Sequence, residues 1–415
     1  MRCLLLNQTF YPDVASTAQH LSDLALGLVQ RGHHVTVLTG RRAYDDPTRI
    51  FAKRETWQGV KILRIRSTAF GKRARWRRAV DFASFMSTCA MRLLFMARPD
   101  VVVTLTSPPL ISFLGAWFAR VRRCRFVYWV MDLNPDEAMA AGWLRRGSLT
   151  AQLLEALSRW SLRQADEVIA LDRFMRERIA VKVARKVHVF PPWAHDGEVK
   201  FDAAGRNRFR RAHALEGRFV VMYSGNHSPC HPLDTLLETA RRLEEVPEIV
   251  FCFVGGGSEW RRIRGLKEKD KLKGRSPKSN VICLPYQPLG ELSGSLSAAD
   301  LHVVVMGEPF VGLVHPCKVY NILQVSAPVL YIGPRSSHVA DLQEATKGEA
   351  RWFGAGHRDV EKVVEAIEQA RKEGVQRERQ VSEVFRSGFS RNAVLPRLIQ
   401  TLEQSFSVRT QERQR

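Results

Sequence analysis

Short apolar runs alternate with amphipathic segments along the first half of the chain. Runs such as Asp100–Leu105 and Arg125–Met131 are apolar at nearly every position, which is typical of parallel strands covered on both faces. In Ser16–Gln30 the apolar residues recur at helical spacing instead. The pattern predicts an open parallel sheet with helices on both sides. The other expected strands are Arg2–Leu6, His34–Thr39, Val60–Ile65, Glu167–Leu171 and Val187–Phe190, and the other expected helices are Ser112–Val121 and Ser148–Ala165.

The pattern is interrupted at Pro191-Pro192-Trp193 and by the polar stretch Ala194–Arg211, and then it begins again. Since a proline pair extends neither helix nor strand, we place a domain boundary here. The later strands are expected at Phe219–Tyr223, Ile249–Val254, Val281–Leu284, Leu301–Val305 and Pro328–Ile332, with helices at Leu233–Glu244 and Lys318–Gln324. We therefore predict an α/β chain of two Rossmann-like domains facing a central cleft. Their ranges are 1–195 and 196–385, followed by a helix and polar tail over 386–415.

Composition places the chain among soluble globular proteins, with 45% hydrophobic and 26% charged residues. Seven cysteines are scattered without metal-ligand spacing, which favours a reducing compartment and free thiols. No secretory signal is visible. The apolar segment Phe82–Ala97 is too short to span a membrane and contains Arg92, so we expect a buried or interfacial helix in a cytoplasmic protein.

The net charge of +22 is distributed unevenly. Residues 1–200 carry 32 Lys and Arg against 17 Asp and Glu, a balance of +15, while the remaining residues carry 32 against 25. Two basic clusters adjoin apolar stretches with Trp76, Trp117 and Phe118. This suits an anionic membrane surface or a polyanionic acceptor, although a solvated helix face explains each cluster equally well. Nucleic-acid binding would account for the positive charge, but it gives no reason for two Rossmann-like domains. The clusters are Lys72, Arg73, Arg75, Arg77 and Arg78, and then Arg120, Arg122, Arg123 and Arg125.

Ligands of open α/β sheets bind outside the carboxyl ends of the strands, so the loops after the strands are the places to search. In the second half most of these loops contain glycine, which lets backbone N–H groups approach phosphate. Gly255-Gly256-Gly257 is a weak signal by itself, and neither a Walker A sequence nor a complete G-x-G-x-x-G is present. The five loops are Ser224–Pro232, Gly255–Ser258, Pro285–Pro288, Met306–Cys317 and Gly333–Ser336.

The segment from His315 to Asn321 carries more specific chemistry. Because Pro316 fits the first turn of a helix, Lys318 and Asn321 are expected near its N-terminus, one turn apart. A lysine there supplies charge to a diphosphate, and an amide supplies hydrogen bonds to ribose hydroxyls. A capped surface helix with an exposed lysine fits the spacing as well, and spacing alone favours it.

Several motifs in this order resemble those of the retaining glycosyltransferases of family 4, which have the GT-B fold. The resemblance covers nearly the whole chain and is closest to the bacterial surface-polysaccharide branch that includes fucosamine and colanic-acid transferases. The helix with Lys318 and Asn321, followed by Pro328-Val329, resembles the family's P-S-K-x-Y-N/E motif most specifically. The other motifs are Phe10-Tyr11-Pro12, Arg31–Thr39, Asp132-Leu133-Asn134-Pro135-Asp136, Tyr223-Ser224-Gly225-Asn226 and Phe253–Gly257.

The resemblance implies a nucleotide-sugar donor, retention of anomeric configuration and a C-terminal helix that crosses back to the first domain. It implies Asp132 as the catalytic residue and a cleft lined by Tyr11, Ser16, Thr17 and Asn134 on the acceptor side. Without a D-x-D triplet we expect no metal and no cofactor besides the co-substrate, with Lys318 and helix N-termini neutralising the diphosphate and His227 assisting. The implied donor-binding residues are Ser224, Gly225, Asn226, His227, Gly255, Gly256, Tyr286, Gly312, Lys318 and Asn321.

The chain departs from the family at three places. Many members carry two glutamates in the donor loop, and counting back from Pro328 these fall on Asn321 and Leu313. Leucine cannot replace a carboxylate, and Glu308 substitutes only if the loop is shifted. The basic residues that many relatives place after the first strand of the second domain are replaced by Asn226, His227 and His231. The glycine-rich turn near the start is replaced by Val14-Ala15-Ser16-Thr17, whose hydroxyls are expected to contact the donor.

Asp132 ends an apolar run and is expected to project from the first domain, where a carboxylate accepts the acceptor's proton or stabilises an oxocarbenium ion. Alternatively it caps the next helix, or forms an acidic turn with Asp136 and Glu137. For the whole chain we expect a glycosyltransferase acting on a lipid-linked glycan, peripheral on the inner face of the cytoplasmic membrane. A sugar-nucleotide epimerase of the same fold and a non-catalytic nucleotide-sugar-binding partner are the alternatives.

Overall fold

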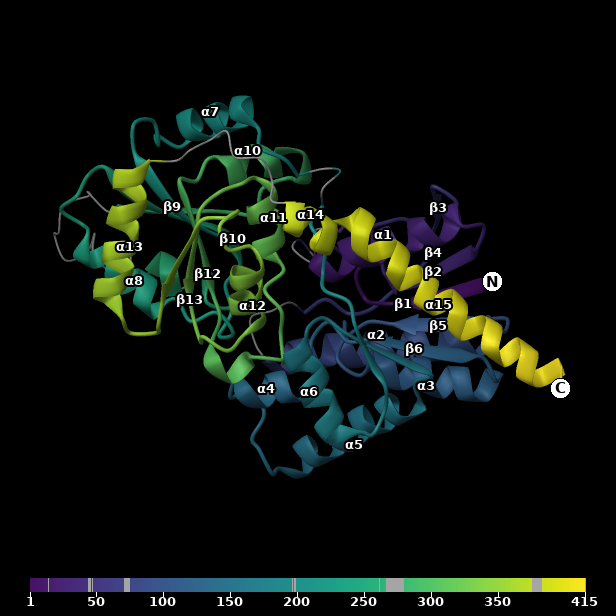
Figure 1. The fold of residues 1–415 in the computed structure, drawn as a ribbon. Coiled ribbons are helices and arrows are strands. Elements are labelled where there is room, and N and C mark those ends of the chain that lie inside the picture. Colours follow the sequence, from purple (N-terminus) through teal and green to yellow (C-terminus); the bar gives the residue numbers. More distant parts are fainter. Residues whose placement is uncertain are drawn as a thin grey trace. The chain divides into compact units, whose positions relative to one another are not determined.

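A computed structural model describes residues 1–13, 15–43, 46, 48–70, 75–195, 197, 199–260, 262–265, 280–374 and 383–414 (Figure 1). The chain forms two compact units. Unit 1 comprises Met1–Pro192, Gly312–His315 and Asn392–Arg415, and unit 2 comprises Trp193–Val311 and Pro316–Arg391. Gly312–His315 therefore belongs to unit 1, although its position in the sequence lies within the range predicted for the second domain.

Unit 1 contains an eight-stranded sheet in the order β3-β4-β2-β1-β5-β6-β7-β8. Every neighbouring pair is parallel except β3 and β4, which form a hairpin around Gln58 and Gly59. Both turn residues have positive φ, as the common two-residue hairpin turn requires. The strand β3 was not predicted from the sequence. The strands are β1 (Arg2–Leu6), β2 (His34–Gly40), β3 (Arg54–Trp57), β4 (Val60–Ile65), β5 (Val101–Thr104), β6 (Arg125–Trp129), β7 (Glu167–Ala170) and β8 (Val187–Val189).

The helices of unit 1 begin with α1 (Ser16–Gln30), whose inner face packs through Leu21, Leu24 and Leu28. The segment expected to form a buried or interfacial helix lies within α2, except for its last three residues. Among the described residues, no helix is both long and apolar enough to cross a bilayer. The others are α2 (Arg75–Leu94), α3 (Ile111–Arg122), α4 (Asp136–Ala140), α5 (Leu149–Gln164), α6 (Arg173–Lys182) and α15 (Arg391–Gln414).

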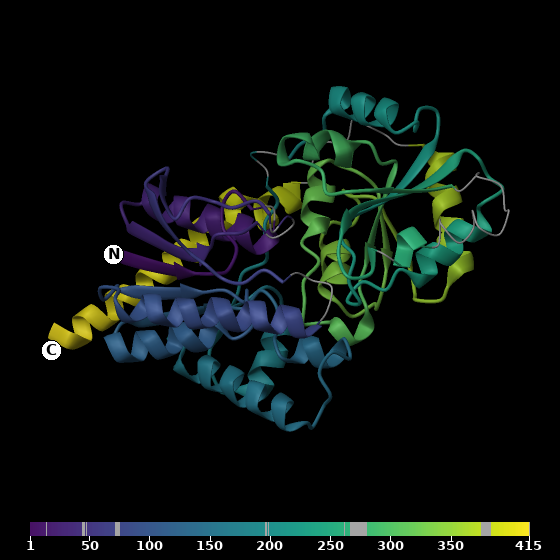
Figure 2. The same ribbon diagram turned by 180° about the vertical axis from the view of Figure 1, so that it is seen from behind.

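The C-terminal helix α15 packs on α1 at the opposite end of the sequence (Figures 1 and 2). Gly27 permits this contact, because a Cβ there would lie 2.6 Å from the Cδ1 of Ile399. Farther along, Glu403 accepts hydrogen bonds from Arg31 at 2.7 Å and from His33 at 2.9 Å. The helix at the end of the chain is thus part of unit 1.

Unit 2 contains a six-stranded, fully parallel sheet in the order β11-β10-β9-β12-β13-β14. Buried residues on its two faces form separate apolar clusters, one around Phe251 and Ile367 and the other around Met222 and Val250. The strands are β9 (Phe219–Asn226), β10 (Ile249–Gly256), β11 (Val281–Leu284), β12 (Leu301–Val305), β13 (Val329–Ile332) and β14 (Trp352–Ala355). The helices are α7 (Ala203–Ala212), α8 (Asp234–Arg242), η1 (Leu289–Glu291), α10 (Leu292–Ser297), η2 (Glu308–Phe310), α11 (Lys318–Gln324), α12 (His338–Ala345), α13 (Val360–Glu373) and α14 (Glu383–Phe389).

Both sheets have a point at which the strand order changes direction. In unit 1 the first strand β1 lies between β2 and β5, and in unit 2 the first strand β9 lies between β10 and β12. Loops leaving such neighbouring strands turn to opposite faces of the sheet, which opens a crevice at their carboxyl ends. The fold therefore marks one edge of each unit as the place to examine for binding groups.

Candidate functional site

The glycine motifs of unit 2 lie side by side at the carboxyl ends of β9 and β10. In the parallel register Gly255 is opposite Gly225, and Gly256 is opposite Asn226. A Cβ on Gly255 would lie 2.1 Å from the carbonyl oxygen of Gly225, and Gly255 has a φ of +130°. Neither the space nor the backbone conformation accepts a side chain. These glycines are thus required to bring two strand ends together, which leaves bare backbone at this edge.

Lys318, the first residue of α11, extends under that edge. Its Nζ lies 3.4 Å from the centroid of the Tyr223 ring and would lie 3.3 Å from a Cβ on Gly225. The stem of the side chain is half-buried, but Nζ is enclosed and has no hydrogen-bond partner among the described residues. Burial lowers the pKa of Lys318 well below its ordinary value.

An enclosed ammonium group without an anionic partner is costly unless a ligand supplies one. The alternative of a capped surface helix is wrong, because the lysine end is buried and Cys317 at the N-cap makes no side-chain cap bond. The arrangement around Lys318 is suited to an anion that reaches the glycine-lined strand ends.

His227 lies in the same loop but is part of an aromatic cluster. Its ring centroid is 4.9 Å from that of Tyr223 and 4.7 Å from that of Trp260, and the residue is fully buried. Burial, and next the charge of Lys318, lower the pKa of His227 to about 3. The imidazole is therefore neutral at pH 7, and the predicted help in neutralising a diphosphate cannot come from its charge.

The remaining predicted residues of this edge differ in exposure. Asn226 is exposed, and its carbonyl oxygen accepts a hydrogen bond from the Tyr223 hydroxyl at 2.8 Å. Ser224 is half-buried. Tyr286 follows β11 with 37% of its surface exposed, and its hydroxyl donates to the Gly256 carbonyl at 3.4 Å. An exposed aromatic ring beside a glycine backbone offers a stacking surface for a planar group.

Asn321 lies one turn after Lys318, as the spacing predicted. Its Oδ1 accepts a hydrogen bond from the backbone N–H of His195 at 3.1 Å. This oxygen thus holds the chain segment that enters unit 2. Its predicted contact with ribose remains a prediction.

The segment before α11 is placed differently from expectation. Gly312 has a φ of +74°, and a Cβ there would lie 2.7 Å from the carbonyl oxygen of Phe174 in α6 of unit 1. Gly312 was predicted among the donor-binding residues of the second domain, but its close neighbours belong to unit 1. Leu313 is buried, and its carbonyl oxygen accepts a hydrogen bond from the Leu133 N–H at 2.7 Å. Glu308 is exposed on η2 in unit 2.

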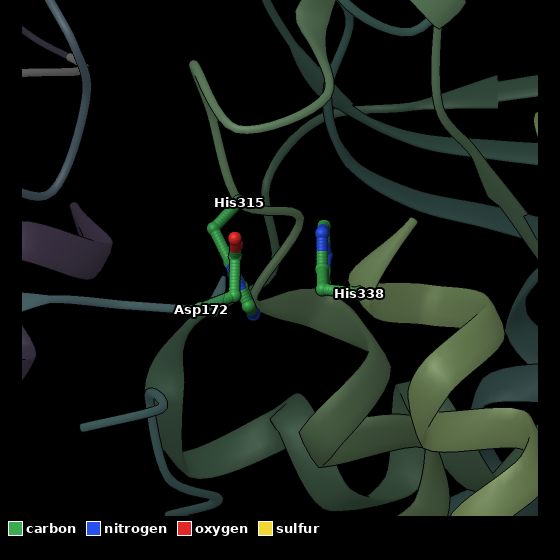
Figure 3. Close-up of side chains that lie close together, drawn as sticks. All are labelled: Asp172, His315 and His338. Carbon is green, nitrogen blue, oxygen red and sulfur yellow. The ribbon is translucent and has the colours of Figure 1, made fainter. Parts of the chain in front are cut away.

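A buried pair of side chains that was not predicted from the sequence fixes this segment. The Nδ1 of His315 lies 2.8 Å from the Oδ2 of Asp172, and both side chains are almost completely buried (Figure 3). The Oδ1 of Asp172 accepts from the Met175 N–H, so the same carboxylate caps α6. An aspartate directly before a helical segment was the available signal for the cap. Figure 3 also labels His338, the first residue of α12 in unit 2.

Asp132 of unit 1 lies just beyond the carboxyl end of β6 and is half-buried. Burial, and then the nearby carboxylate of Glu137, raise its pKa. Its interpretation as a helix cap is wrong, because α4 begins at Asp136 and has Pro135 at its N-cap without a side-chain bond. The acidic first turn consists of Asp136 and Glu137, which leaves Asp132 outside the helix.

Lys182 holds the turn after Asp132 in place. Its Nζ lies 2.7 Å from a carboxylate oxygen of Asp136 and 2.7 Å from one of Glu155, and its side chain is 6% exposed. Two further hydrogen bonds fix the same turn. The Leu133 N–H donates to the Leu313 carbonyl, and the Ser158 hydroxyl donates to the Asn134 carbonyl at 3.0 Å.

The other predicted acceptor-side residues lie in loops at the same edge or at the start of α1. Tyr11 stacks on Trp57 with ring centroids 4.0 Å apart. The Thr17 hydroxyl lies 3.2 Å from that of Thr9, and Ser16 is exposed at the start of α1.

Residues 17–193 match the family model described as a glycosyl transferase 4-like domain. This part of the chain carries a glycosyl transferase 4-like domain. The chain is 24% identical over 392 residues to the putative colanic acid biosynthesis glycosyl transferase WcaI of Escherichia coli K12, covering 89% of this chain and 92% of that protein. It is also 24% identical over 254 residues to the probable glycosyltransferase WbjE of Pseudomonas aeruginosa, covering 60% of this chain and 61% of that protein.

Solved structures resemble the chain along nearly its whole length. Sucrose-phosphate synthase from Thermosynechococcus elongatus aligns with a TM-score of 0.71 and 16% identity, covering 98% of this chain and 100% of that one. Anabaena Alr3699/HepE in complex with UDP-glucose aligns with a TM-score of 0.68 and 15% identity, covering 97% and 100%. The predicted GT-B fold is confirmed.

Proposed function

We propose that this glycosyltransferase transfers a sugar from a UDP- or GDP-linked donor to a lipid-linked or polysaccharide acceptor during cell-surface polysaccharide biosynthesis. The observation that carries the donor assignment is the enclosed ammonium of Lys318 at glycine-lined strand ends, which has no hydrogen-bond partner in the part of the chain that the structure describes. A nucleotide diphosphate supplies the missing anion, and bare backbone lets it approach closely. The names of the WcaI and WbjE relatives and the UDP-glucose complex of the Anabaena protein support the same class of reaction.

In this proposal Lys318 stabilises charge on the departing diphosphate, and the exposed Tyr286 ring stacks on the base of the donor. Lys318 supplies positive charge, so the reaction as proposed needs no metal. Asp132 receives the proton of the acceptor hydroxyl. Its pKa is raised to about 8, so the ionised carboxylate is a stronger base than an ordinary one, and the fraction able to accept the proton grows as the pH rises towards 8. We propose that the anomeric configuration is retained through displacement on the front face of the sugar, with the leaving diphosphate helping to orient the acceptor hydroxyl whose proton passes to Asp132.

Donor binding is tested by thermal shift of the full chain against UDP-, GDP- and dTDP-sugars and the free nucleoside diphosphates. One donor series is expected to stabilise the wild type, and Lys318→Met is expected to lose that response to both sugar nucleotide and free diphosphate. Lys347→Met is the matched control, because this lysine of unit 2 is 75% exposed. Equal responses from Lys318→Met and wild type would remove the lysine from the donor site.

Turnover separates the proposal from its alternatives. Incubation with donor alone is expected to give no isomerised sugar nucleotide, whereas an epimerase converts it without an acceptor. Asp132→Asn is expected to bind donor normally and transfer at least tenfold more slowly, as loss of a general base requires. Normal transfer by this variant would end the catalytic role of Asp132. A wild type that binds donor without transfer to any acceptor would point to a non-catalytic partner.

We also propose that the enzyme works at the inner face of the cytoplasmic membrane, with the basic start of α2 against anionic lipid. Arg77 and Arg78 lie over the rings of Trp76 and Phe82, and Trp76 is 62% exposed. Lys72 and Arg73 of that cluster lie outside the described residues, as does the side chain of Arg75. Replacing the five basic residues of this cluster by glutamine is expected to weaken flotation with anionic liposomes.

Two arginines of the second basic cluster form hydrogen bonds within unit 1. Arg120 donates to Gln164, and Arg122 donates to the Leu94 carbonyl at 2.7 Å. The proposed contact with lipid therefore uses α2 rather than α3.

A further inference from the structure

The start of α5 carries large apolar side chains on the outside of unit 1. Leu149 is 84% exposed and Leu153 is 59% exposed, and the two are one helical turn apart. The opposite face of the helix packs inward through Ala151, Ser158 and Leu162. Because the inner face already covers the sheet, the two leucines are not needed for the core of unit 1.

Two arginines accompany the exposed leucines. Arg145 and Arg146 lie in the turn before α5, and both are exposed. Among the described residues neither guanidinium has a hydrogen-bond or ion-pair partner. We define the α5 rim as these two arginines with Leu149 and Leu153. Exposed apolar groups next to unpaired cations are the composition of interfacial membrane-binding segments.

The fold places the α5 rim at the edge of unit 1 that carries Asp132. In a parallel sheet each helix that follows a strand begins near the carboxyl edge, and α5 follows β6 through the turn of Asp132 and the short helix α4. The helix α2 begins at the same edge, and α3 packs against both α2 and α5 (Figures 1 and 2). Trp76 with Arg77 and Arg78 on α2 therefore lies on one side of α3, and the α5 rim lies on the other.

We propose that the α5 rim is a second membrane-docking surface, which takes an anionic bilayer. The arginines bind headgroup phosphates, and the two leucines insert at the boundary with the acyl chains. The positive charge of this rim favours an anionic bilayer over a second copy of the chain. Residues 1–200 carry a balance of +15, and a symmetric contact through this rim would bring Arg145 and Arg146 of two copies together.

This inference rests on the proposed membrane location and deepens it. Docking through both α2 and α5 puts the edge with Asp132 next to the bilayer, where the sugar of a lipid-linked acceptor begins. Contact at two separated helix starts also fixes the orientation of unit 1, which a single basic helix cannot do.

Flotation of the full chain with vesicles of phosphatidylglycerol and phosphatidylcholine tests the proposal. Leu149→Ser with Leu153→Ser is expected to reduce the bound fraction at least tenfold, because both apolar insertions are lost. Arg145→Gln with Arg146→Gln is expected to weaken binding about tenfold at low salt, with less effect on vesicles of phosphatidylcholine alone. The control is Val181→Ser on α6, since Val181 is 83% exposed but lies outside the rim.

The outcomes separate this inference from the proposed function. The rim variants are expected to keep the wild-type melting temperature, the thermal response to donor and transfer to a soluble short-chain acceptor, while Lys318→Met keeps flotation. Unchanged flotation of both rim variants would overturn the inference. It would also be overturned if the leucine variant abolished a concentration-dependent dimer in light scattering without affecting vesicle binding.

Discussion

Replacement of Lys318 by methionine is expected to stabilise the ligand-free protein while removing donor binding. Methionine keeps the unbranched stem and deletes only the charge, so the packing around this half-buried residue is largely preserved. The ammonium group lies 3.4 Å from the Tyr223 ring centroid, and its Nζ has no hydrogen-bond partner among the described residues. The variant therefore removes a desolvation cost together with a single cation–π contact.

The two contributions differ in size. Enclosing an ion costs several kcal/mol, and a cation–π contact returns about 1–2 kcal/mol. The net gain of the variant is about 2 kcal/mol, which corresponds to about 4–8 °C in the melting temperature of a domain of this size class. Differential scanning calorimetry without ligand measures this gain. By contrast, the rise in melting temperature on adding donor is expected to vanish in the variant.

The pH dependence gives an independent check. Burial lowers the pKa of Lys318 from its ordinary value of 10.5, so between its folded and unfolded pKa values the unfolded chain binds more protons. The stability of the wild type relative to Lys318→Met therefore rises as pH increases towards 10. A variant that melts below the wild type at pH 7, with a difference independent of pH, would refute the idea that the enclosed charge is unpaired.

Three further predictions concern the residues around the two strand edges. Gly255→Ala puts a Cβ 2.1 Å from a backbone oxygen at a φ of +130°, so urea unfolding is expected to show a free energy of unfolding lower by about 3 kcal/mol or more. The control Gly290→Ala, with nothing within 4 Å of its Cβ, is expected to stay within about 0.5 kcal/mol of the wild type. Lys182→Met leaves the carboxylates of Asp136 and Glu155 without their buried cation, and chemical denaturation is expected to show a free energy of unfolding lower by about 3 kcal/mol. Lys186→Met, at an exposed lysine, is the control, and equal losses of stability in the two variants would contradict the reasoning. Burial lowers the pKa of His231 to about 3, so folded protein stays neutral there while the unfolded chain protonates, and stability falls by about 1.4 kcal/mol per pH unit below about 6.5 for this group. His231→Asn, which retains a donor for the Val305 carbonyl, is expected to flatten the acid limb of a melting-temperature profile, and a slope unchanged from wild type would count against it.

The alternation of strands and helices could be predicted because it depends on neighbours a few residues apart. Most strands lie where the apolar runs predicted them, and the two glycine motifs lie at the carboxyl ends of β9 and β10. The hairpin strand β3 was missed, since Arg54–Trp57 is charged and its signal was the short turn at Gln58 and Gly59. The pair of Asp172 and His315 was missed for a different reason. These residues are far apart in the sequence, and only folding brings them within 2.8 Å of each other.

Sequence by itself determined two α/β halves, the loops where ligands bind and the resemblance to family 4. Tertiary structure decided the electrostatic state of the residues in those loops. Local spacing predicts that Lys318 is exposed, yet Tyr223 and Gly225 enclose its charge. The sequence suggests that His227 could carry a positive charge, yet its burial among aromatic neighbours keeps it neutral. Periodicity is set along the chain, whereas desolvation depends on which distant residues exclude water, so only the folded chain fixes which groups carry charge.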